Sequence, residues 1–115
     1  MSETLVTNWP EADYRKCVQE TFQKIASSFE AIDPDVAECE QSFGVLTILF
    51  PDRTKIILST QPSVRQIWVA IAFQGTAIHF NYDHSSREWR DDKGRGFELM
   101  TLLRETLAQV ARISL

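Results

Sequence analysis

The sequence lacks the features of a membrane or exported protein. No apolar run approaches the roughly 20 residues that a membrane-spanning helix needs. The first ten residues contain Glu3 but neither Lys nor Arg, so they have neither the charged start of a secretory signal nor the Arg-rich start of a transit peptide. We therefore expect a cytoplasmic protein, or a mature chain already trimmed of its leader, with no membrane partner.

Cysteine and recognisable catalytic motifs are also scarce. Cys17 and Cys39 are too few for a disulfide framework and lack the close spacing of a metal site, so we expect free thiols. The chain has no Gly-x-Ser-x-Gly, no glycine-rich phosphate loop and no His-x-x-x-His pair. His84 is expected in a solvated loop and His79 on an open sheet face. We predict no catalytic residues.

Acidic residues are plentiful, and they are unevenly distributed. Residues 1–42 contain nine acids and three bases, a net charge of −6, whereas residues 43–115 contain seven acids and nine bases, a net charge of +2. An acidic end argues against nucleic acid as a partner, because phosphate contacts need clustered Lys and Arg. It favours cations or a basic protein surface.

The length of 115 residues fits one domain, in which we expect residues 1–10 to be flexible. Apolar residues recur every three or four positions near both ends, as in amphipathic helices, and short β-branched and aromatic stretches lie between them, as in strands. The predicted elements are helices at 11–32 and 97–113 and strands at 36–41, 45–50, 55–59, 66–73, 77–82 and around Trp89.

The short connections between these strands predict an antiparallel sheet, because parallel neighbours need long crossovers. Both helices need an apolar surface to cover, and one face of the sheet provides it. We therefore predict an α+β fold: a two-layer sandwich with two terminal helices on one face of an antiparallel sheet of about six strands.

The strand predicted at 66–73 alternates clearly between two faces. Ile67, Val69, Ile71 and Phe73 share the face expected in the core, while Gln66, Trp68, Ala70 and Ala72 share the other. Trp68 is therefore predicted on the open, polar face, where a large aromatic side chain has no folding role. We interpret it as a functional residue.

Five acids fall within eleven positions: Glu30, Asp33, Asp35, Glu38 and Glu40. Asp13 and Glu20, earlier on the predicted helix, would extend the same surface. Carboxylates are hard oxygen ligands suited to Fe²⁺, Fe³⁺, Mn²⁺, Ca²⁺ or Mg²⁺. Because no compact loop of ligands is visible, we expect weak binding at several sites. The alternative is an acidic face that only keeps the protein in solution.

Several stretches carry a family resemblance. They are Glu38-Cys39-Glu40, Gly44-Val45-Leu46-Thr47-Ile48, Lys55-Ile56-Ile57, Gln66-Ile67-Trp68-Val69-Ala70, His79-Phe80, Glu88-Trp89, and Gly96 with Leu102-Leu103. From Asp13 onward the chain resembles the frataxin family, its bacterial members above all. The most specific part is Gln66-Ile67-Trp68 downstream of Val45-Leu46-Thr47.

This resemblance implies a non-enzymatic regulator or iron donor in iron–sulfur cluster assembly, in the bacterial cytoplasm or, alternatively, as a mature mitochondrial protein. It implies weak binding of Fe²⁺ and Fe³⁺ on an acidic ridge, and docking on a cysteine desulfurase and a scaffold protein. We expect a monomer, with iron-dependent oligomers as the alternative. The matching metal residues are Glu30, Asp33, Asp35, Glu38, Glu40 and Asp13, and the matching partner-binding residues are Trp68, Gln66, Glu38 and Glu40.

The chain departs from the family in the middle of the first helix, where Ala26 and Ser27 replace acids that relatives often carry. Two other functions remain open from the residues themselves. One is a ferroxidase that oxidises Fe²⁺ at paired carboxylates, and the other is a small acidic secretion chaperone with an apolar dimer surface.

Overall fold

The computed structural model describes residues 9–111, so the prediction that residues 1–10 are flexible falls mostly outside it. Helix α1 is followed by six strands and then helix α2. The elements are α1 (Glu11–Ser28), β1 (Glu38–Ser42), β2 (Val45–Leu49), β3 (Lys55–Gln61), β4 (Gln66–Ile71), β5 (Thr76–Asp83), β6 (Glu88–Asp91) and α2 (Leu99–Ala111), with 3-10 turns η2 (Pro62–Val64) and η3 (Ala72–Gln74) flanking β4.

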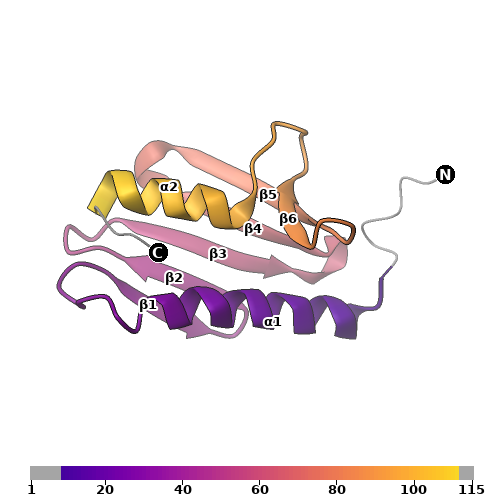
Figure 1. Ribbon diagram of the computed structural model, residues 1–115, viewed down its shortest axis with the longest axis horizontal. Coiled ribbons are helices and arrows are strands. Elements are labelled where there is room, and N and C mark those ends of the chain that lie inside the picture. Colours follow the sequence, from indigo (N-terminus) through magenta and orange to yellow (C-terminus); the bar gives the residue numbers. More distant parts are fainter. Residues whose placement is uncertain (1–8, 112–115) are drawn as a thin grey trace.

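The six strands form one antiparallel sheet in the order of the sequence, β1 to β6. Both helices lie on the same face of this sheet, in front of it in Figure 1, and the described residues contain no third α-helix to cover the opposite face. This arrangement confirms the predicted two-layer α+β sandwich. No helix among residues 9–111 is long and apolar enough to span a bilayer.

The core fills the space between the helices and the covered face of the sheet. Each helix contributes a stripe at spacings of three and four, and each inner strand contributes alternate residues. The fully buried large side chains are Tyr14, Ile25, Leu46, Ile48, Ile56, Leu58, Ile67, Ile71, Ile78, Phe80, Leu99 and Leu103. Burial of each such side chain contributes about 1.5–3 kcal/mol.

Tyr14 fixes the start of α1 to the sheet. Its hydroxyl donates to the Gln66 carbonyl oxygen at 2.5 Å and accepts the Gln61 backbone N–H at 3.0 Å. The side chain thereby satisfies two backbone groups where β3 passes into β4, and burial raises the pKa of the phenol. The helix register is set by this contact as well as by apolar packing.

Several predicted ends differ from the observed ones, and local turns explain two of them. Helix α1 ends at Ser28 because the chain tightens there into i→i+3 bonds, from Phe29 N–H to the Ala26 carbonyl and from Ile32 N–H to the Phe29 carbonyl. Strand β4 ends at Ile71, and the turn that follows leaves Phe73 36% exposed rather than in the core.

Candidate functional site

The acidic segment, by which we mean Glu30, Asp33, Asp35, Glu38 and Glu40, runs along the connection from α1 into β1. The connection is a tight turn in which the Val36 N–H donates to the Asp33 carbonyl at 2.8 Å. The Asp33 carboxylate also accepts the Asp35 N–H at 2.9 Å, an Asx turn that proline at position 34 accommodates. All five acidic side chains are exposed. The turn between α1 and β1 places these five side chains along one edge of the fold.

Within the described residues, β1 is an edge strand that pairs with β2 alone. Glu38 lies opposite Leu49 and Glu40 opposite Thr47, so both carboxylates leave the same face, about 7 Å apart along the strand. Asp35 and Glu38 also line one small surface hollow beside the β2–β3 turn. Glu38 and Glu40 therefore lie on the open face of the sheet at its β1 edge, and Asp35 lies beside Glu38.

Cys39 alternates with these glutamates and packs toward the core. Burial, and secondarily the charge of Glu40, raise the pKa of the Cys39 thiol to about 11. Because a protonated thiol is a poor metal ligand, this edge offers a cation oxygen donors. Oxygen donors suit iron as a hard cation rather than zinc–thiolate chemistry.

The acidic segment enters no ion pair with any other residue of the described range 9–111. Asp13 is likewise exposed, but it lies fifteen residues before Ser28 on α1, about 22 Å along the helix axis. The structure therefore gathers five of the six predicted metal residues along one edge and leaves Asp13 apart from them.

Among residues 9–111, no three His, Cys, Asp or Glu side chains are placed to enclose a metal ion. The donors that are present fit a hard cation held by one or two carboxylates and completed by water. Such a cation would be bound weakly, and the weak binding expected from the sequence stays a prediction.

Trp68 lies on the open face of the sheet, as predicted, and is held there by its neighbours. Its ring stacks on His79, directly across the β4–β5 pair, with centroids 4.1 Å apart and planes 10° from parallel. Its indole Nε1 donates to Gln66 Oε1 at 2.7 Å. The side chain is only half-buried, so part of the indole remains available for contact.

Gln66 differs from its prediction as an exposed partner-binding residue, because it is only 8% exposed. Its Nε2 donates to Asn81 Oδ1 at 3.0 Å and to Asp92 Oδ2 at 3.2 Å. These groups come from β5 and from the loop after β6, so alternation within one strand did not reveal them. Gln66 thus orients Trp68, and its own amide is not exposed to a partner.

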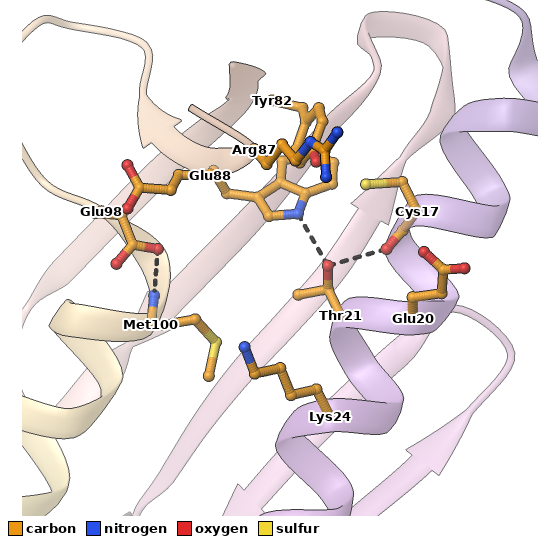
Figure 2. A pocket seen from close by; sticks show the side chains of 10 residues that line it. Cys17, Glu20, Thr21, Lys24, Tyr82, Arg87, Glu88, Glu98 and Met100 are labelled. Carbon is orange, nitrogen blue, oxygen red and sulfur yellow. Dashed lines mark hydrogen bonds between the residues drawn. The ribbon is translucent and has the colours of Figure 1, made fainter. Parts of the chain in front are cut away.

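A hollow of about 180 Å³ between α1, the β5–β6 hairpin and the start of α2 was not predicted (Figure 2). Three segments distant in sequence form it, so no local pattern could have revealed it. Its lining residues are Cys17, Glu20, Thr21, Lys24, Tyr82, Arg87, Glu88, Trp89, Glu98 and Met100.

Several residues that line this hollow have structural roles. The Thr21 hydroxyl accepts the Trp89 indole N–H at 3.0 Å and donates to the Cys17 carbonyl at 2.9 Å. The Glu98 carboxylate accepts the Met100 N–H at 2.9 Å and so caps α2. Burial raises the pKa of the Cys17 thiol, which keeps it protonated rather than nucleophilic.

A frataxin-like domain model matches residues 7–113. An iron–sulfur cluster assembly protein CyaY of Pseudomonas aeruginosa is 36% identical over 99 residues, covering 86% of this chain and 89% of that protein. A protein of the same name from Pseudomonas fluorescens Pf-5 is 34% identical over 105 residues, covering 91% and 92%.

Among solved structures, frataxin from Psychromonas ingrahamii aligns with a TM-score of 0.81 at 22% identity and covers 93% of this chain and 96% of that chain. At that identity the likeness supports the fold. The family model spans all the described residues and the CyaY relatives align over most of the chain. This chain therefore belongs to the frataxin-like family.

Proposed function

We propose that this chain acts in iron–sulfur cluster assembly in the bacterial cytoplasm, as a non-enzymatic regulator that binds Fe²⁺ and Fe³⁺ weakly and docks on the cysteine desulfurase and its scaffold protein. The names of its curated relatives support the assembly role. Iron binding and docking are supported by one observation. The five carboxylates of the acidic segment are exposed and make no ion pair with another described residue.

Iron is cargo or effector in this proposal, not a resident cofactor. One or two carboxylates of the acidic segment, with water, would hold the ion on an exposed surface. The neighbouring carboxylates add electrostatic attraction for the cation within about 8–10 Å, the distance beyond which salt screens exposed charges. The ion would exchange quickly and could modulate contact with a partner.

Docking would combine charge and one aromatic contact. The acidic segment would steer the protein toward a basic groove of the desulfurase, which raises the association rate and makes it sensitive to salt. Trp68 would then contact the desulfurase–scaffold complex from the open face. Because Gln66 and His79 already fix the indole, little side-chain entropy would be lost on binding.

Membership of the frataxin-like family removes the secretion-chaperone alternative. The ferroxidase alternative predicts oxygen consumption when Fe²⁺ is added, with loss of that activity in a Glu38→Gln/Glu40→Gln variant. The regulator proposed here predicts no such catalytic oxygen uptake.

The main test measures affinity for the purified cysteine desulfurase at low and high salt. Removing two charges of the acidic segment with Glu38→Gln/Glu40→Gln should weaken binding on the order of tenfold at low salt and flatten the salt dependence. A matched control, Glu11→Gln/Glu105→Gln, removes two exposed charges elsewhere and should bind like the wild type. No binding by the wild type, with or without Fe²⁺ and scaffold, would refute the proposed function.

Trp68→Ala tests the open-face contact. The side chain is only half-buried, so the protein should stay folded, with a loss of about 1 kcal/mol from the aromatic stack. Affinity for the desulfurase–scaffold complex should fall on the order of tenfold or more, as for an aromatic anchor. Trp68→Phe should retain most of it. Unchanged affinity, or an unfolded variant, would exclude the assigned role.

A further inference from the structure

The β1–β2 hairpin closes with a two-residue turn, Phe43-Gly44, between the last paired residues Ser42 and Val45. Both turn residues have positive φ, +44° at Phe43 and +82° at Gly44. Positive φ at both positions is the pattern of a type I′ turn, where the first residue is normally Asn, Asp or Gly. An aromatic residue is strained in this left-handed region.

The Phe43 side chain also lacks any packing that would compensate for the strain. Its relative exposure is 105%, whereas the other exposed large apolar residues of the described range lie between 36% and 38%. Phe43 therefore disfavours the folded state through its backbone, and its solvated ring gains no burial that would offset this strain. Such local strain, when the rest of the structure maintains it, points to a function outside folding.

The turn that carries Phe43 is firmly seated. The Gly44 carbonyl accepts the Thr60 N–H at 2.9 Å, which ties the hairpin tip to β3. A Cβ at Gly44 would lie 2.6 Å from Thr60 Oγ1, so the tip and β3 are in close contact. The ring is therefore displayed from a fixed position rather than from a loose loop, which reduces the entropy lost on binding.

The surroundings of Phe43 specify the chemistry of a partner. Residues 30–42 contain five acids and no base, and Glu40 lies three residues from Phe43, about 10 Å along β1. A surface that accepts the ring would also face these carboxylates. Aromatic anchors at interfaces typically enter apolar pockets bordered by polar or charged groups.

We propose that Phe43 is an apolar anchor that enters a socket on the cysteine desulfurase bordered by Arg or Lys side chains, next to the contacts of Glu38 and Glu40. This inference rests on the proposed function and adds to it a residue that the acidic segment and Trp68 do not include. Phe43 would act after electrostatic encounter, so it should govern dissociation more than association.

The test is Phe43→Asn, which creates the Asn-Gly pair that a type I′ turn prefers. The variant should unfold at a higher temperature than the wild type, yet dissociate from the purified desulfurase on the order of tenfold faster. Phe43→Tyr keeps the ring and should bind within about threefold of the wild type. Phe97→Asn, which removes another exposed aromatic ring far along the chain, should not change the affinity.

Three results would overturn the inference while leaving the proposed function intact. They are wild-type affinity in Phe43→Asn, a melting temperature in Phe43→Asn no higher than that of the wild type, and sedimentation that shows the wild type alone to self-associate through Phe43. Failure of the wild type to bind the desulfurase would instead refute the proposed function, and this inference with it.

Discussion

Two regions of this molecule each carry five carboxylates, and they use them differently. The first is the acidic segment. The second is the β5–α2 region, residues 83–98, with Asp83, Glu88, Asp91, Asp92 and Glu98. In the β5–α2 region each carboxylate has a partner within the fold, and four bases are interspersed with them. In the acidic segment only Asp33 accepts a hydrogen bond from another described residue.

The pKa values reflect this difference. The Ser85 hydroxyl and backbone lower the pKa of Asp83 to about 2. Burial would raise the pKa of Asp91, but backbone N–H donors from Arg95, Phe97 and Lys93 outweigh it and lower the pKa to about 2. Acid count alone therefore does not identify a binding surface. Carboxylates without internal partners are the ones available to a cation or a basic protein.

The largest stability loss is expected at Asp91. Its two oxygens accept backbone N–H groups of Lys93 at 2.9 Å, Arg95 at 3.1 Å and Phe97 at 2.9 Å. Asp91→Asn replaces one acceptor oxygen with a donor, which leaves a backbone N–H unpaired and lowers the melting temperature.

The Asp91 effect has a defined pH dependence. Because folding lowers its pKa from 3.8 to about 2, the stabilisation is complete above the unfolded value and is lost as the pH falls through this interval. The difference in melting temperature between wild type and Asp91→Asn should be constant near neutral pH and shrink between about pH 4 and pH 2. A difference that does not change with pH would contradict this role for the carboxylate.

A smaller loss is expected at Glu98, whose carboxylate accepts the N–H groups of Met100 and Thr101 at the start of α2. Glu98→Ala should reduce the free energy of unfolding by about 1 kcal/mol, as for other lost helix caps. Urea unfolding measures the change. An unchanged midpoint would mean that the Glu98 carboxylate does not stabilise the start of α2.

The smallest effect is expected in the acidic segment. Glu40→Gln removes a charge that has no described ion-pair partner, so the free energy of unfolding should stay within about 0.5 kcal/mol of the wild type. A loss as large as that of Glu98→Ala, measured in the same urea series, would remove the distinction between the two regions.

The sequence predicts the fold well, because the periodicities of helix and strand extend over whole elements and do not depend on distant contacts. The ends of α1 and β4 were wrong because turns at Phe29 and Phe73 compete with the repeating pattern. For the site, local crowding predicted the acidic segment, and alternation predicted the orientation of Trp68.

Side-chain partnerships that join distant segments were not predictable. Gln66 is buried by Asn81 and Asp92, which belong to other elements. The engagement of Asp91 and Glu98 depends on how the loop before α2 folds back, and single-sequence patterns do not show this.

A titration of the protein with Fe²⁺ in the absence of oxygen, followed by amide NMR, tests most directly whether the acidic segment binds iron. Because four of the five carboxylates of the acidic segment accept no hydrogen bond from another described residue, amides of residues 30–40 should shift or broaden first, before those of residues 83–98. Equal or earlier changes in residues 83–98, or no localised change, would contradict the claim that carboxylates without internal partners form the iron-binding surface.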